Sequence, residues 1–192
     1  MSARSAWLER LIRSFKRSMH VVPPPPGSGP PLDLDRHRLG DVRVGDSIDR
    51  LGDFGPVEDE AAIADGDFRY YCRGIWFSAT KGAVDSFGVF WRDTDRQGFL
   101  PFAGWVHFRQ ESFALDATTT EADFVERFGA PYWRDREREI LLFYECGDIE
   151  WQVEFNRKKL LCALTIISPP LLADPKQRKM YRVTRGWPPH DV

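Results

Sequence analysis

The hydrophobic pattern between residues 118 and 131 predicts a short helix. Phe124, Val125 and Phe128 recur at helical spacing and therefore share one face. Two turns of helix are not stable alone in water, because nucleation costs more than so few hydrogen bonds return. We therefore expect this helix to lie on the strands that follow it.

The same stretch contains residues typical of helix ends. Thr120 can cap the first turn, and Asp123 stands in the reciprocal position of a capping box. Thr118 and Glu121 offer the same pairing one register earlier. Gly129 favours a left-handed exit, which predicts that the helix ends there.

A similar pattern occurs earlier, between residues 44 and 56. Ser47 takes the place of the cap, and the apolar, glycine and proline positions after it are Leu51, Phe54, Gly55 and Pro56. Their counterparts in the later stretch are Thr120, Phe124, Phe128, Gly129 and Pro131. The earlier stretch is shorter by one residue before its glycine and by another before its proline.

An aromatic strand with a tight break follows each predicted helix. Residues 68–77, FRYYCRGIWF, can be laid beside residues 142–151, LFYECGDIEW. In each segment a tyrosine, Tyr71 or Tyr144, is followed shortly by cysteine and glycine. We interpret the pattern as an internal duplication, with repeats at about residues 40–108 and 113–168.

The strand patterns predict antiparallel sheets that are covered on one face. Trp151, Val153 and Phe155 alternate with the polar residues of the same strand, which are Glu150, Gln152 and Glu154. One side of this strand should face the core and the other should face solvent. Residues 160–167 are almost wholly apolar, which is typical of a central strand or one buried on both faces.

The first half of the chain contains comparable strands at residues 84–91 and 98–108, and an acidic loop at residues 58–67. Together these patterns predict an α+β fold. It consists of two tandem repeats, each a short helix plus antiparallel strands, with the helices packed on one face of the sheet.

The spacing of cap, apolar residues, glycine and proline resembles the helix–sheet module of the BamE/SmpA and beta-lactamase-inhibitor-protein superfamily. Every position of the second copy, from Thr120 to Pro131, fits that spacing, and the resemblance covers roughly residues 40–167. It implies helices on one side of an antiparallel sheet whose free face binds another protein. The lipid-bearing cysteine of the superfamily's envelope members has no counterpart near the start of this chain.

Composition divides the 192-residue chain into four parts. Residues 1–20 form a basic arm, and residues 21–32, VVPPPPGSGPPL, form a linker that should act as a tether. The tandem helix–sheet domain is expected at residues 33–168. Residues 169–192 are predicted to form an extended tail that packs on the domain through Leu171, Leu172, Tyr181 and Trp187.

The arm is amphipathic at helical spacing. Its apolar side includes Trp7, Leu11 and Phe15, and its basic side includes Arg13, Lys16 and Arg17. Such a helix can lie in an anionic membrane interface, dock on a protein groove, imitate an organellar targeting peptide or cover an apolar patch on its own domain. No segment of the sequence is long and apolar enough to be read as a membrane span. We expect a cytoplasmic protein that can associate with a membrane surface through residues 1–20.

Charge is distributed unevenly along the chain. The formal net charge is −2, but residues 1–20 carry +4 and residues 169–192 carry +3, which leaves −9 for residues 21–168. An acidic body does not favour binding of nucleic acid, whose phosphates require a basic surface. It favours a basic protein as the partner.

The sequence lacks the common local motifs of metal binding and of phosphate or nucleotide binding. The four histidines lack the spacings of zinc sites, and neither GxGxxG nor GxxxxGK[ST] is present. Cys72, Cys146 and Cys162 have no paired spacing, which favours buried thiols in a reducing compartment. We therefore predict no enzymatic activity, catalytic residue, cofactor or metal. A hydrolase that uses Cys72 or Cys146 is the minority alternative.

These patterns favour a non-enzymatic protein-binding module that recognises a basic protein, in the manner of an immunity protein that inhibits a toxin or enzyme. The alternative is a peripheral membrane or assembly adaptor that acts through the arm. The predicted partner-binding residues lie on the acidic loop and on the sheet surface, and they are Glu58, Asp59, Glu60, Trp133, Glu150, Gln152 and Glu154.

Overall fold

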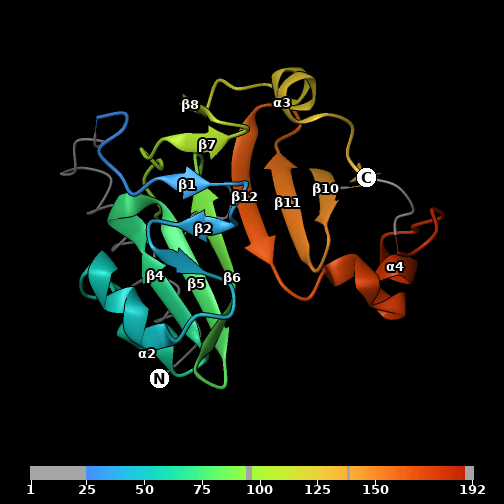
Figure 1. Cartoon of the computed structure of the whole chain (residues 1–192). Helices are drawn as coiled ribbons and strands as arrows, with labels where there is room; N and C mark the ends of the chain where they lie inside the picture. The colour runs from blue at the N-terminus through green and yellow to red at the C-terminus, as the bar shows by residue number, and fades with distance from the viewer. Residues whose placement is uncertain (1–24, 94–96, 138, 189–192) are drawn as a thin grey trace, which may run out of the picture.

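The computed structural model describes residues 25–93, 97–137 and 139–188. The arm and the first part of the linker lie outside these residues. The described chain forms two β-sheets with a few short helices (Figure 1). The predicted α+β class with mainly antiparallel strands is confirmed. In this part of the chain no helix has both the length and the apolar character needed to cross a bilayer.

The larger sheet has seven strands, and all of its neighbouring pairs are antiparallel. Its spatial order is β4(Asp67–Tyr70), β5(Ile75–Thr80), β6(Ala83–Phe90), β12(Leu161–Ile167), β11(Ile149–Phe155), β10(Ile140–Cys146) and β9(Trp133–Asp135). The two halves of the chain therefore meet at β6 and β12, where Val89 is paired with Leu164. The apolar run at residues 160–167 forms a central strand, as its composition predicts.

The smaller sheet has five short strands. Its order is β3(Val42–Arg43), β2(Arg38–Leu39), β1(Leu32–Asp33), β7(Val106–Phe108) and β8(Glu111–Phe113), and the β1–β7 pair is parallel. This sheet lies across β4, β5 and β6 in Figure 1. Apolar residues of both sheets, among them Leu39, Val106 and Phe77, belong to one buried cluster.

The strand predicted at residues 98–108 is correct only for residues 106–108. Before that point the backbone bonds to two separate partners instead of to one neighbouring strand. The amide of Leu100 donates to the carbonyl of Tyr71 at 2.8 Å. The amide of Phe102 donates to the carbonyl of Phe90 at 2.6 Å. The apolar composition of residues 98–105 thus reflects packing in an irregular segment.

The folded domain begins before the predicted residue 33. Leu32 is completely buried in β1, and its amide donates to the carbonyl of Trp105 at 2.8 Å. The amide of Gly29 donates to the carbonyl of Ala103 at 3.4 Å. A Cβ at Gly29 would lie 2.9 Å from the amide nitrogen of Gly104, so only glycine allows this close approach. From residue 25 onward the predicted tether is docked on the domain.

The helix predicted between residues 118 and 131 is α3(Glu121–Phe128). Its capping box is the one formed by Thr120 and Asp123, with the Asp123 carboxylate accepting from the Thr120 amide at 2.9 Å. The alternative register is not used, because Thr118 donates to Asp116. Gly129 follows the helix with φ +87°.

The earlier helical stretch is shorter and more tightly wound. It forms the 3₁₀ helix η1(Ile48–Phe54), whose cap, Ser47, accepts from the amide of Asp49 at 3.3 Å. The segment expected to be an acidic loop contains the short helix α2(Glu60–Ile63), and η2(Tyr71–Arg73) lies between β4 and β5. The tail is not fully extended, because it contains η3(Leu171–Ala173) and α4(Pro175–Met180).

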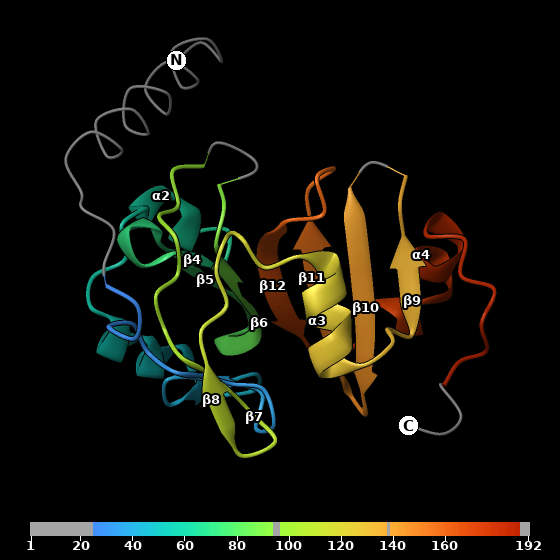
Figure 2. The same cartoon turned by 90° about the horizontal axis from the view of Figure 1, so that it is seen from above.

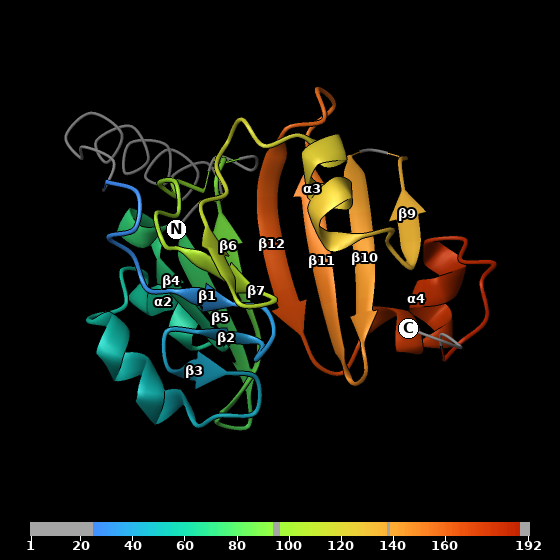
Figure 3. The ribbon, with the colours of Figure 1, turned by 45° about the horizontal axis from the view of Figure 1, so that its top comes forward.

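Alternation along β10 defines the two faces of the seven-stranded sheet. Leu142 and Tyr144 belong to the main core cluster, on the face covered by α3 and by the smaller sheet, here called the inner face. Phe143 points the other way, to the outer face, and packs in a second cluster with Tyr132 and Leu172. Figure 3 shows α3 in front of β11 and β10, and Figure 2 shows α4 beyond β9. Helical segments therefore cover parts of both faces.

Candidate functional site

Strand register places rows of side chains across the outer face. The middle row crosses all seven strands in the order Arg69, Trp76, Gly88, Thr165, Gln152, Phe143 and Trp133. The row on one side of it is Asp67, Ser78, Ser86, Ile167, Glu150 and Glu145. The row on the other side is Phe90, Ala163, Glu154, Leu141 and Asp135. These rows hold five carboxylates and one basic residue, so the outer face is acidic.

The C-terminal segment, residues 169–188, covers the β9–β10 end of the outer face. Tyr181 packs on Phe143 with ring centroids 5.1 Å apart, and the Trp133 indole donates to the Tyr181 carbonyl at 3.1 Å. Arg178 donates to the hydroxyl of Tyr132 at 2.9 Å. The four apolar residues singled out in the tail, Leu171, Leu172, Tyr181 and Trp187, all belong to the second cluster. The segment is therefore anchored by apolar side chains and by hydrogen bonds together.

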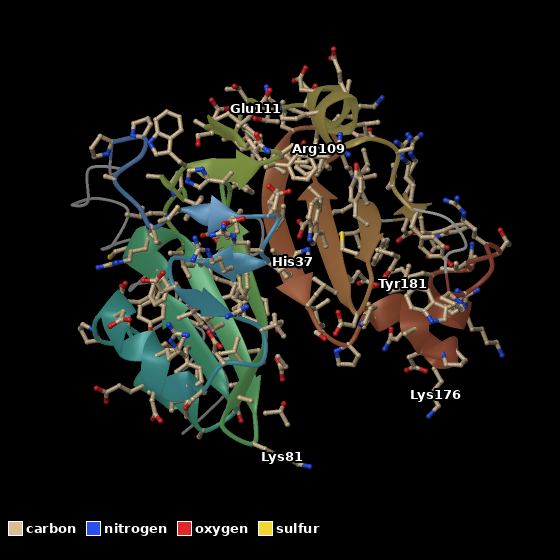
Figure 4. All side chains as sticks on the ribbon, in the orientation of Figure 1. His37, Lys81, Arg109, Glu111, Lys176 and Tyr181 are labelled. Atoms are coloured by element: carbon tan, nitrogen blue, oxygen red, sulfur yellow. The ribbon has the colours of Figure 1, made fainter. Side chains whose placement is uncertain are left out.

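The same segment is strongly basic. Its basic residues are Lys176, Arg178, Lys179, Arg182 and Arg185, and it has one acidic residue, Asp174. Figure 4 shows Lys176 projecting away from the sheet, whereas Tyr181 lies against it. Arg182 forms an ion pair with Glu137 at 2.6 Å on the exposed surface. A basic segment thus lies on the acidic end of the outer face.

Two buried carboxyl groups lie beneath this segment. Glu145 and Glu150 stand directly opposite each other on β10 and β11, with exposed fractions of 6% and 0%. Glu150 accepts hydrogen bonds from the Gln152 side chain at 2.6 Å and from the Leu172 amide at 3.0 Å. Neither carboxyl oxygen of Glu145 accepts a hydrogen bond from an N–H or hydroxyl donor of the described residues, and its hydrogen-bonding neighbour is the Glu150 carboxyl.

The middle of the outer face is partly open. Trp76, Thr165 and Gln152 are each partly exposed, and with Gly88 they form what we call the central floor. The Trp76 indole lies on Gly88, because a Cβ at that glycine would be 3.0 Å from two of the indole carbons. At one border of the floor Phe99 stacks on Phe90, with ring centroids 4.2 Å apart.

The predicted partner-binding residues on the sheet differ in how exposed they are to solvent. Gln152 and Glu154 are partly exposed on the outer face, as predicted. The prediction of an exposed carboxylate is wrong for Glu150, because the C-terminal segment covers it and bonds to it. Trp133 is half-buried and tied to the same segment. A partner-binding role for these residues stays a prediction.

Two acidic side chains of the predicted loop bond to residues of the neighbouring strand and turn. The Glu58 carboxylate accepts from the Cys72 amide at 3.0 Å. Asp59 accepts from the Tyr71 hydroxyl at 2.8 Å and lies 3.6 Å from the Arg69 guanidinium. Glu60, in the first turn of α2, is exposed. The six arm residues predicted to bind a membrane or partner lie outside the described part of the chain.

Two of the three cysteines, Cys146 and Cys162, have thiols with raised pKa values. Burial raises the pKa of the Cys146 thiol to about 11, with a further contribution from Glu145. Burial likewise raises the pKa of Cys162 to about 11. Because the thiolate is the reactive form, these shifts oppose the hydrolase alternative at Cys146. Within the described ranges no group of three or more metal-ligating side chains is placed to hold a metal ion.

Sequence reasoning missed the central floor and the carboxyl pair, although signals for both exist. Gly88 interrupts an otherwise bulky strand, which is typical of a close approach by another group. Glu145 and Glu150 are equally distant from the two-residue turn Gly147–Asp148, and a tight hairpin there pairs them.

Comparison with known proteins gives only distant similarity. No family model matches the chain, and no curated protein matches it. A solved structure of a DUF4309 family protein from Bacillus subtilis is similar over 68% of this chain and 84% of that chain, with 14% identity and a TM-score of 0.49. A cysteine-rich secretory protein from Staphylococcus aureus is similar over 80% of this chain and 49% of that chain, with 13% identity and a TM-score of 0.42. Neither similarity is close enough to indicate a function.

Proposed function

We propose that the chain is a non-enzymatic protein-binding module that docks a basic partner protein on the outer face of its seven-stranded sheet, with the central floor as the point of contact. One observation carries the proposal. The acidic end of this face already holds a basic segment with apolar anchors, which is the chain's own C-terminal segment. An immunity-like inhibitor of a basic toxin or enzyme is a function of this class.

Charge supports the choice of partner. The body of the chain, residues 21–168, carries a net charge of −9. On the outer face Glu154 and Asp67 lie in the rows that flank the central floor. Opposite charge on a partner would speed the encounter and orient it, and the effect would weaken as salt screens the surface.

The composition of the central floor supports a protein as the ligand. Trp76 is a large, rigid aromatic side chain fixed in place on Gly88, and aromatic residues of this kind are frequent energetic anchors of interfaces. Thr165 and Gln152 beside it supply hydrogen-bonding groups. The resemblance to the BamE/SmpA and beta-lactamase-inhibitor-protein superfamily, in which a free sheet face binds another protein, agrees with this assignment.

We further propose that the two halves are tandem repeats. Each half has a capped helix that is followed by a glycine with φ near +80°, Gly55 at +81° and Gly129 at +87°. The first half then has three successive antiparallel strands, β4 to β6, and the second half has four, β9 to β12; the last strand of each half, β6 or β12, lies beside the other. The tyrosines also play similar roles, because each donates to a backbone carbonyl of the helical stretch before it, Tyr70 to Leu51 within η1 at 3.1 Å and Tyr144 to Gly129 just after α3 at 3.0 Å. The structural counterpart of Tyr144 is therefore Tyr70, not Tyr71.

If the repeats are equivalent, Tyr70→Phe and Tyr144→Phe should destabilise the domain by similar amounts. Each change removes one hydrogen bond from a strand, β4 or β10, to the backbone of an earlier helical stretch or its end, which is expected to cost about 1 kcal/mol. Urea unfolding of the two variants measures both costs. A loss at one position with none at the other would contradict the proposed equivalence.

The docking proposal is tested by placing a positive charge on the central floor. Thr165→Arg introduces a long basic side chain at the centre of the face, on a residue that is already partly exposed. Gln110→Arg introduces the same side chain at an exposed turn of the smaller sheet and serves as the matched control. The full-length chain and both variants are used as bait in native lysate of the source organism, at low and at high salt.

We expect the wild type and Gln110→Arg to capture the same basic protein, in amounts that fall as salt rises. Thr165→Arg should lose that protein while keeping the wild-type circular dichroism spectrum and unfolding midpoint. Capture of the protein by all three chains alike would contradict docking on the central floor.

A further inference from the structure

Glu145 and Glu150 form an unusual pair, because two carboxyl groups of the same sign stand opposite each other without solvent. Both are more than nine-tenths buried and they occupy paired positions on β10 and β11. Two ionised carboxylates so placed repel each other and lose their hydration, and only Glu150 regains hydrogen bonds, from Gln152 and Leu172. The arrangement is stable only if the pair holds a proton.

The hydrogen bonds indicate which of the two residues holds it. Glu150 accepts from the Gln152 side chain and from the Leu172 amide, and two donors favour a carboxylate. Glu145 accepts no hydrogen bond from an N–H or hydroxyl donor of the described residues, so the neutral acid is the form that suits its site. Glu145 is therefore the residue whose surroundings favour the protonated form.

The pair is connected directly to the C-terminal segment. The Leu172 amide that bonds to Glu150 belongs to η3, and the Leu172 side chain is fully buried in the second cluster. The charged and titratable groups that face the pair from the C-terminal segment are Arg178 and Tyr181, whereas Cys146, the neighbour of Glu145 on β10, packs on the inner face. Arg178 favours the ionised form of Glu145, but it is opposed by burial and by Glu150.

We propose that Glu145 and Glu150 share a single proton as a latch, and that loss of this proton releases the C-terminal segment from the outer face. Release would uncover Phe143, Trp133 and the carboxylates beneath the segment, and so would extend the open surface beyond the central floor. The latch does not require that the central floor binds a partner, so either proposal can fail without the other.

The direction of the pH dependence follows from the folded-state pKa. Burial, followed by the charge of Glu150, raises the pKa of Glu145 from 4.5 to about 9. An acid whose pKa is raised by folding stabilises the docked state fully below its ordinary pKa, and this stabilisation is lost as pH rises through the window up to about 9. Docking should therefore weaken from mildly acidic to alkaline pH.

The test compares the wild type with Glu145→Gln, which has nearly the same shape and is permanently neutral. Amide hydrogen exchange at Leu172 is measured in the full-length chain, and the two proteins are compared at each pH so that intrinsic exchange cancels. We expect similar protection at about pH 5 and at least about tenfold faster exchange in the wild type at about pH 9. Equal pH dependence in both proteins would overturn the proposal.

Glu137→Gln is the matched control, because it removes the exposed ion pair between Glu137 and Arg182 on the same segment without touching the buried pair. It should keep the wild-type pH dependence, and a flat profile in this variant would overturn the assignment to Glu145. A carbon-13 titration of the Glu145 carboxyl in the wild type does not depend on any variant folding. A midpoint above about pH 7 supports the latch, whereas an ordinary midpoint of about 4.3 overturns it.

Discussion

Phe124→Ala is expected to lower the free energy of unfolding by about 3–5 kcal/mol, the usual cost of truncating a buried phenylalanine. Phe124 is completely buried, and its ring centroid lies 4.2 Å from that of Phe128, 5.8 Å from Phe155 and 5.9 Å from Tyr144. The ring therefore joins α3 to β10 and β11 at once. Since domains are commonly stable by only about 5–15 kcal/mol, this change should remove a large part of the total.

Urea unfolding followed by circular dichroism measures this loss. Val125→Ala is the matched control, because Val125 is the next residue of the same helix and is only partly buried. It should cost about 1 kcal/mol or less. Equal costs at the two positions would show that Phe124 does not anchor the helix.

Gly74→Ala is expected to destabilise the domain by about 3 kcal/mol or more, through backbone strain and steric overlap together. Gly74 has φ +66°, which alanine adopts only at a cost. A Cβ there would overlap the Leu100 carbonyl oxygen and would lie 2.7 Å from the Phe102 amide nitrogen. Both are backbone atoms, so the irregular segment at residues 98–105 would have to move away from residue 74.

Gly147→Ala separates the two causes. Gly147 has φ +72°, but a Cβ there would have no atom within 4 Å. It should show only the strain of the left-handed backbone, about 1 kcal/mol. A thermal melt of both variants at the same pH gives the comparison, and an equally mild effect at Gly74 would mean that the segment adjusts without cost.

The parts of the fold that sequence reasoning predicted are those set by local chemistry. The helix α3 was predicted with its cap, because Thr120 and Asp123 satisfy each other's backbone groups within a few residues. The core side of β11 was predicted because its side chains alternate with a period of two. These signals depend on neighbours in the chain, so no knowledge of the tertiary structure is needed to interpret them.

The parts that were missed depend on contacts between distant segments. Composition alone presents residues 25–32 as a flexible linker, yet Gly29 and Leu32 bond to residues 103–105. Glu150 looked like a solvent-facing residue because its strand alternates, whereas the C-terminal segment supplies Leu172 to cover it. A period of two shows which residues share a face, but it does not show what covers that face.

Prediction of the candidate site is limited in the same way, because part of it depends on contacts between distant segments. Gln152 and Glu154 were placed on the correct face by alternation, whereas Trp76, which lies in the middle row of the same face, was not singled out. Seven tryptophans cannot be ranked by exposure from sequence, because the strand pairing that sets Trp76 over Gly88 is not local.

The outermost strands of the seven-stranded sheet are also its shortest, with three residues in β9 and four in β4. Their charged side chains include Asp67 and Arg69 on β4 and Arg134 on β9. Short, charged edge strands offer few unpaired backbone groups, so they resist the edge-to-edge pairing that leads to aggregation. Little backbone is therefore available at either edge for an eighth strand to join the sheet.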